Sequence, residues 1–208
     1  MIKHIIFDFG GVLVDLNPDL SFNALRDIFD CEPSTPLPPK IQRILNEYEV
    51  GSFGEASFMH RLQLLKKEIP GERDLLDAWN AMLLDLPKVR LDWILELRKK
   101  YTVSLLSNTN HTHIEWVRSL LRRRDRIVGF EELYFDNVFY SHKINLRKPN
   151  LDIYNHVINE LGATPAEAIF IDDSQVNIDG ALAAGWQAVR HDPNQEIMKQ
   201  LDHYLLNY

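Results

Sequence analysis

The residues HIIFDFGG, at 4–11, contain a β-branched and aromatic run that stops at two glycines, and this pattern predicts a short buried strand over 4–9. Four similar runs follow, at residues 102–107, 137–141, 168–171 and 186–190. Segments with helical spacing of apolar residues alternate with these runs, at 93–100, 111–122, 151–162, 174–184 and 194–206. Strands separated by helices form right-handed βαβ units. The sequence therefore predicts an α/β fold on a doubly wound parallel (Rossmann-like) sheet.

One long segment interrupts this alternation directly after the first strand. From about residue 18 to 86 the sequence contains no convincing strand and instead predicts four helices. The first opens at Pro18, the second ends at Gly51, the third begins at a capping pair of Ser52 and Glu55 and runs through Leu65, and the fourth covers 73–84. We therefore expect a core of residues 1–16 and 87–208, with residues 17–86 as an all-helical insertion.

The composition excludes several classes of protein. Hydrophobic residues make up 45% and charged residues 25% of the 208, which excludes wholesale disorder, and the net charge of −7 argues against a nucleic-acid partner. No apolar stretch approaches the roughly 20 residues of a transmembrane helix, and no signal-peptide pattern is visible. The single cysteine, Cys31, favours a reducing compartment. We expect a cytoplasmic protein with no nucleic-acid or membrane partner, either a monomer or a homodimer.

Polar residues follow four of the predicted strands, at the edge of the sheet where parallel folds bind ligands. They form four groups, namely Asp8 with Gly10 and Gly11, Ser107 to Asn110, Arg147 with Lys148, and Asp172 with Asp173. Carboxylate oxygens hold Mg²⁺, a cation and a hydroxyl hold phosphate oxygens, and one carboxylate is free to attack. This set of groups favours phosphoryl transfer.

These groups also lie within four motifs that resemble those of the haloacid dehalogenase-like hydrolase superfamily. They are FDFGGVLVD at 7–15, LLSNTN at 105–110, Lys148 within RKPNLDIY, and FIDDSQVNIDGALAAG at 170–185, in the family's order along the chain. Many members of this superfamily are phosphatases with an aspartate nucleophile. The resemblance also implies that the insertion is a helical cap of the family's first type.

The resemblance implies a role for each strand-end carboxylate. Asp8 would attack phosphorus and form an aspartyl-phosphate that water then hydrolyses. The cofactor Mg²⁺ would be held by Asp8, by the main-chain carbonyl of Gly10 and by Asp173, with Asp172 helping directly or through water. The expected partner of this site is a small phosphorylated metabolite.

The substrate-binding residues follow in the same way, with one main departure from the family pattern at Gly10 and a smaller one at Asn145, where many relatives have glycine. Lys148, Ser107 and the backbone N–H of Asn108 would hold the phosphate, and Gly10 lets the backbone approach it. The family's phosphatases usually carry a second aspartate, the general acid and base, two residues after the nucleophile, and here that position is Gly10. A missing acid costs about 10²–10⁴-fold on a poor leaving group. The DFGGV form resembles a subgroup with glucose-1-phosphate phosphatases, so sugar phosphates, including anomeric ones, are the expected substrates.

Two other functions stay open, and some residues have plainer interpretations. A metal-free 2-haloacid dehalogenase also lacks that acid, although the pair Asp172–Asp173 would repel its carboxylate substrate. A non-catalytic phosphate-binding or regulatory protein could keep the pocket without turnover. His111 and His113 are expected to be surface or packing residues, because residues two apart on a helix point to different faces.

Overall fold

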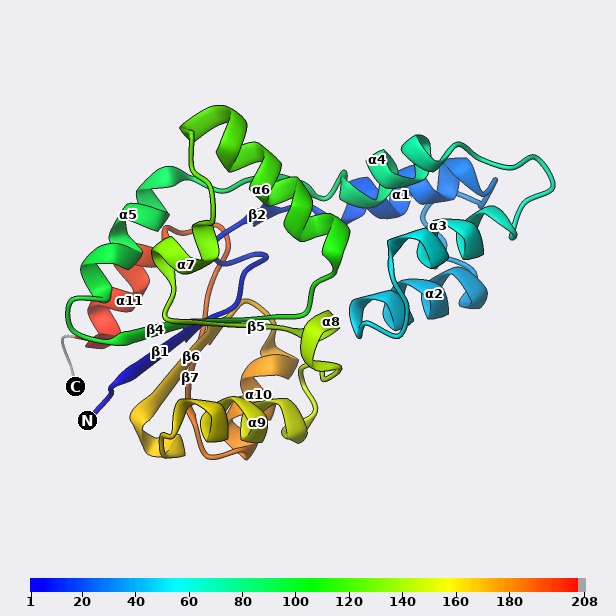
Figure 1. The fold of residues 1–208 in the computed structure, drawn as a ribbon. Helices are drawn as coiled ribbons and strands as arrows, with labels where there is room; N and C mark the ends of the chain where they lie inside the picture. The colour runs from blue at the N-terminus through cyan, green and yellow to red at the C-terminus, as the bar shows by residue number, and fades with distance from the viewer. Residues whose placement is uncertain (206–208) are drawn as a thin grey trace.

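The computed structural model describes residues 1–205, and in this range it confirms the predicted parallel sheet (Figure 1). Its strands run in the order β5-β4-β1-β6-β7, and every pairing is parallel. Their bounds are β1 His4–Phe7, β4 Thr102–Ser107, β5 Asn137–Tyr140, β6 Ala168–Asp172 and β7 Gln187–Arg190. Because β4 and β6 flank β1 on opposite sides, the strand order reverses at β1. This reversal is where open parallel sheets bind ligands.

Helices cover both faces of the sheet (Figure 1). One face packs against α5 (Lys88–Leu97), α6 (His111–Asp125), α7 (Phe130–Tyr134) and α11 (Ile197–Leu205). The other packs against α9 (Leu151–Leu161) and α10 (Gln175–Ala183). Side chains alternate along a strand, so Ile5 and Phe7 enter the first cluster and Ile6 the second. Both faces of β1 are therefore buried, which explains its unbroken apolar run.

Four helices lie together beyond the carboxyl ends of the strands (Figure 1). They are α1 (Pro18–Ile28), α2 (Pro39–Glu49), α3 (Glu55–Gln63) and α4 (Glu72–Asn80). The α1 helix begins where expected, since Asn17 Oδ1 accepts the Asp19 N–H at 3.2 Å and Pro18 occupies the first turn. These helices have a hydrophobic cluster of their own, centred on Tyr48, Phe58 and Trp79.

The prediction that the insertion contains no strand is wrong. Residues Leu83–Asp85 form β3, which pairs antiparallel with β2 (Asp15–Leu16). The predicted helix over 73–84 accordingly ends early, at Asn80. Ser21 Oγ donates to Trp79 O at 2.8 Å and accepts the Met82 N–H at 2.9 Å, so a residue of α1 fixes the exit from α4. Such long-range contacts override local helical spacing.

Several smaller predictions were also wrong at the ends of elements. The α3 helix begins after Gly54 with no side-chain cap, so Ser52 does not cap it, and it ends at Gln63. The α5 helix covers 88–97 instead of 93–100, and α11 starts at Ile197 instead of residue 194. The predicted end of that helix at 206 lies outside the described residues. The helices α7 and α8 (Ser141–Ile144) and a short 3₁₀ turn, Pro165–Glu167, were not predicted.

Within residues 1–205, no helix is long and apolar enough to cross a bilayer.

Candidate active site

Asp8 stands directly after β1, at the carboxyl end of the central strand. Its backbone N–H donates to Ile171 O at 2.8 Å, which continues the pairing of β1 with β6. The side chain is bent back so that Oδ1 accepts the Phe9 N–H at 2.7 Å. Only 8% of the residue is exposed. The strand pairing and this local hydrogen bond therefore fix a buried carboxylate at the reversal point of the sheet.

Lys148 is the cation that faces this carboxylate. Its ammonium is buried and contacts Asp8 Oδ1 at 2.8 Å, Asp172 Oδ2 at 2.6 Å and Leu106 O at 3.1 Å. The loop that carries it is held by Asn108, whose side-chain amide bonds both the Lys148 N–H and the Lys148 C=O at 2.9 Å. Lys148 precedes a cis proline. The ends of β1, β4 and β6 thus meet at one ammonium group.

Asp172 and Asp173 follow β6, and the structure gives them different surroundings. Asp172 is fully buried, and besides Lys148 it accepts hydrogen bonds from Ser174 N at 2.8 Å and from Asn177 Nδ2 at 3.0 Å. Asp173 is partly exposed and lies close to Gly11, where an added Cβ would meet Asp173 Oδ2 at 2.5 Å. Gly11 also has a φ of +75°, so glycine is needed there for both reasons. Carboxylate oxygens of Asp8, Asp172 and Asp173 lie within 4.8 Å of one another.

The charges of this cluster do not balance, since three carboxylates surround one ammonium. Burial raises the pKa of Asp8 to about 7, with Asp172 adding to the rise and Lys148 opposing it. Burial, and then Asp172, also raises the pKa of Asp173. Burial works against the charge on Lys148, yet Asp8 and Asp172 raise its pKa overall. A set of oxygen donors with excess negative charge fits Mg²⁺.

A cavity of about 140 Å³ adjoins this cluster. Its floor includes Gly10, Ser107 and Asn108, so these three predicted residues share one space. Glu49, from the end of α2, lines the same cavity. The sequence analysis did not predict Glu49. Nothing in the sequence of a helix end indicates that its last acidic residue lies near strands that are distant in the chain.

The end of α2 is fastened to the core beside this cavity. Ser141 Oγ lies 2.5 Å from Glu49 O and 3.0 Å from Thr109 O, and it accepts the Thr109 N–H at 2.9 Å. Asn145 Nδ2 donates to Val50 O at 2.9 Å. Asn145 itself adopts the left-handed conformation, with φ of 56°, that asparagine tolerates.

The two histidines lie outside the carboxylate cluster, although His113 lines the cavity beside it. His113 is buried, stacks on Trp79 with ring centroids 4.8 Å apart, and lies 3.2 Å from Trp79 O. Burial lowers the pKa of His113 to about 4, so its ring is neutral. His111 is exposed and lies 3.7 Å from Glu55.

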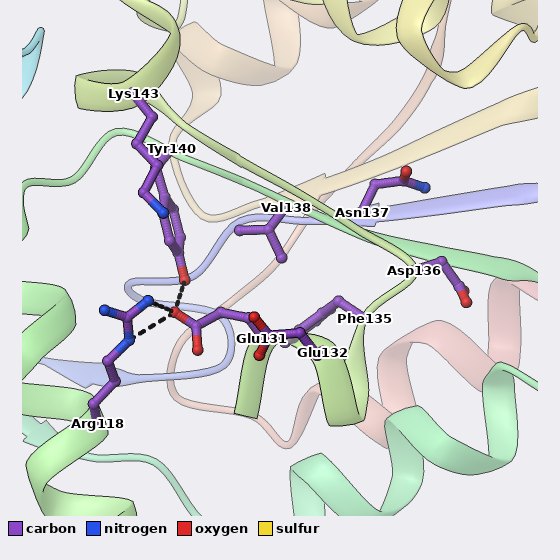
Figure 2. Close-up of a pocket in the computed structure, with 9 residues that line it drawn as sticks. All are labelled: Arg118, Glu131, Glu132, Phe135, Asp136, Asn137, Val138, Tyr140 and Lys143. Carbon is purple, nitrogen blue, oxygen red and sulfur yellow. Dashed lines mark hydrogen bonds and ion pairs between the residues drawn. The ribbon is translucent and has the colours of Figure 1, made fainter. Parts of the chain in front are cut away.

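A larger pocket of about 240 Å³ lies beside the edge strand β5 (Figure 2). Arg118 approaches Glu131 at 2.5 Å, and Tyr140 Oη lies 3.4 Å from the same carboxylate oxygen, as the dashed lines in Figure 2 show. These charged and polar groups already pair with one another. The pocket contains none of the predicted site residues and is a weaker candidate than the carboxylate cluster.

The chain is similar along most of its length to named phosphatases and to a solved structure. A D-ribitol-5-phosphate phosphatase of Bacteroides thetaiotaomicron is 30% identical over 203 residues, which cover 97% of each chain. A phosphorylated carbohydrates phosphatase of Thermotoga maritima is 28% identical over 189 residues, covering 89% of this chain and 82% of its own. A solved structure of a haloacid dehalogenase (HAD) family enzyme from Bacteroides thetaiotaomicron, in complex with magnesium and inorganic phosphate, has a TM-score of 0.78 at 27% identity. It covers 94% of this chain and 96% of its own.

The family itself is shown by a match along most of the sequence. The model of the haloacid dehalogenase-like hydrolases matches residues 2–185, a range that includes all four strand-end groups and the insertion. This match confirms the resemblance drawn from the motifs. The chain belongs to the haloacid dehalogenase-like hydrolase family.

Proposed function

We propose that this protein is a Mg²⁺-dependent phosphatase that hydrolyses a small phosphorylated metabolite of the sugar or polyol phosphate class through an aspartyl-phosphate on Asp8. The observation that carries the proposal is the buried contact of Asp8 with Lys148 at 2.8 Å, with Asp173 in the same cluster. The names of the two curated relatives support the substrate class.

Asp8 is the nucleophile in this proposal. The Lys148 ammonium and the Phe9 N–H both contact Oδ1, which holds the carboxylate in one orientation. One carboxylate oxygen attacks phosphorus, the ester oxygen departs, and water later attacks the aspartyl-phosphate and regenerates Asp8. Fixing the attacking group before the substrate arrives lowers the entropy cost of the reaction.

Asp8, Asp173 and the main-chain carbonyl of Gly10 would hold Mg²⁺, in keeping with its preference for oxygen ligands. When bound, this ion supplies the positive charge that lets an anionic carboxylate approach an anionic phosphate. Asp172 already accepts bonds from Lys148, Ser174 and Asn177. We therefore assign it to positioning Lys148, with any contact to the ion made through water.

Lys148, Ser107 and the backbone N–H of Asn108 hold the non-transferred phosphate oxygens in this scheme. Ser107 and Asn108 line the cavity beside Gly10. The Asn108 side chain is occupied by the Lys148 backbone, so we assign the phosphate contact to the main-chain N–H of Asn108. We further propose that residues 17–86 act as a cap over a core of residues 1–16 and 87–208, excluding water during transfer.

Loss of the nucleophile is the direct test. We expect purified protein with Mg²⁺ to hydrolyse p-nitrophenyl phosphate, and Asp8→Asn to abolish this activity. Asp27→Asn, an exposed aspartate of α1, is the matched control and should keep wild-type turnover. Chelation with EDTA should stop the reaction and added Mg²⁺ should restore it, whereas a metal-free dehalogenase would be indifferent. Wild-type turnover by Asp8→Asn contradicts the proposal.

A further inference from the structure

The position of the family's usual general acid carries no side chain in this protein, and the Leu16 side chain packs against it. Residue 10 is a glycine, and an added Cβ would meet Leu16 Cδ1 at 2.4 Å and Leu16 Cγ at 3.3 Å. An aspartate at position 10 would therefore require the Leu16 side chain, in β2, to move aside. If the leaving oxygen receives a proton from the protein, the donor stands elsewhere.

Glu49 is the carboxylic acid that lines the cavity beside Gly10. It lines the same cavity as Gly10, Ser107 and Asn108, although it belongs to α2 of the insertion. The other lining residues are apolar, amide or hydroxyl residues apart from His113, so within the described residues Glu49 is the one carboxylic acid on this wall. His113 is held against Trp79 O at 3.2 Å.

The surroundings of Glu49 suit an acid that holds a proton. Its side chain is 24% exposed, and Arg147 Nη2 approaches Oε2 at 3.7 Å, beyond hydrogen-bonding distance. Burial raises the pKa of Glu49 to about 7, and the Arg147 charge only partly offsets this. Brønsted behaviour favours a general acid whose pKa is near the working pH.

The backbone of Glu49 is also fixed over the sheet. Its carbonyl lies 2.5 Å from Ser141 Oγ, and the next carbonyl, that of Val50, accepts from Asn145. Gly51 follows with a φ of +72°, and an added Cβ there would meet His142 O at 2.1 Å. The chain needs glycine at this point to turn so closely against the core. The backbone that carries the Glu49 side chain is therefore held in one position.

We infer that Glu49 is the proton donor that the cap supplies in place of the missing acid at position 10. This inference rests on the proposed phosphatase function. As Asp8 forms its bond to phosphorus, the P–O bond to the substrate breaks, and the leaving oxygen takes the proton of Glu49 to become an alcohol. Glu49, now a carboxylate, accepts a proton from the water that attacks the aspartyl-phosphate. The P–O bond to Asp8 breaks, and hydrogen phosphate leaves.

The substrate class follows from this assignment. With an acid available, the enzyme is not restricted to leaving groups that depart unaided, such as anomeric sugar phosphates. Phosphates of ordinary alcohols, including primary ones on a sugar or polyol, become the expected substrates.

The test compares two leaving groups in one variant. Glu49→Gln should lower kcat/KM for ribitol 5-phosphate, an alkyl ester, by about 10²–10⁴-fold. It should lower kcat/KM for p-nitrophenyl phosphate, whose leaving group needs no proton, by less than about threefold. Glu49→Asp should recover part of the loss on the alkyl ester. The matched control is Glu47→Gln on the same helix, which should change neither rate.

Other outcomes overturn the inference. Equal losses on both esters would mean that Glu49 only positions the cap, and no loss on the alkyl ester would mean that it donates no proton. Failure of the wild type to hydrolyse any alkyl phosphate would also refute it. A series of aryl phosphates with different leaving-group pKa values gives a second measurement. The kcat/KM of Glu49→Gln should fall more steeply with rising leaving-group pKa than the kcat/KM of the wild type. The Asp8→Asn experiment is independent of these results, since wild-type turnover by that variant would refute the proposed phosphatase function itself.

Discussion

Replacing Lys148 by methionine removes the ammonium while keeping an unbranched side chain of similar length. In the structure this group joins Asp8 at 2.8 Å and Asp172 at 2.6 Å, and its side chain has no exposed area. Removing one partner of a buried ion pair costs about 3–5 kcal/mol. For a chain of this size the midpoint of thermal unfolding should then fall by roughly 6–20 °C. Catalytic activity should be lost as well.

The dependence on pH distinguishes this explanation from simple loss of packing. Without the ammonium, the folded-state pKa of Asp8 rises further above its unfolded value, so the variant loses more stability as pH rises. We would measure urea unfolding in EDTA at about pH 8 and about pH 5, with the exposed Lys99→Met as control, which should stay within about 1 kcal/mol. A Lys148→Met penalty of under about 1 kcal/mol, or one equal at both pH values, would refute the reasoning.

Three further predictions concern the acid position, the buried carboxyl groups and the cap. In the Glu49→Gln background, Gly10→Asp together with Leu16→Ala should restore more of the alkyl phosphatase rate than Gly10→Asp alone. In the single variant the Leu16 side chain, whose Cδ1 stands 2.4 Å from the added Cβ, must first move aside. Because burial raises the pKa of Asp8 from 3.8 to about 7, metal-free protein should lose stability as pH rises across this interval, as followed by urea unfolding, and Mg²⁺ should reduce the loss. Ser141→Ala should cost about 1–3 kcal/mol in unfolding experiments, since it leaves the Thr109 N–H unpaired, and should raise KM by loosening α2. Unchanged KM and stability would count against the role of Ser141.

The sheet and its strand-end groups could be predicted because both depend on local sequence. The apolar runs of β1 and β6 are continuous, since both faces of these strands are buried. Each run ends in a polar residue that the parallel topology sends to the same edge. Asp8 and Asp172 both reach Lys148 for this reason, whereas Lys148 itself comes from the loop after α8.

The boundaries within the insertion could not be predicted in this way. The sequence from Arg73 to Leu84 has helical spacing, yet the helix ends at Asn80 because Ser21, about sixty residues earlier, bonds Trp79 O and the Met82 N–H. The strand β3 exists because Leu83–Asp85 meets Asp15–Leu16. Two or three residues of strand give too short a pattern to detect without their partner.

Glu49 could not be predicted because its place at the cavity also depends on long-range contacts. Its position on α2 affects substrate selectivity. The other proposed catalytic groups belong to residues 1–16 and 87–208, whereas Glu49 reaches the cavity because α2 is held by Ser141 and Asn145. The same segment would therefore both enclose the substrate and donate the proton. A phosphate ester too bulky for α2 to seat against the core would lose the acid together with the exclusion of water. Such substrates should be rejected through kcat, by loss of the proton donor, even where the phosphate itself is bound by Lys148 and Ser107.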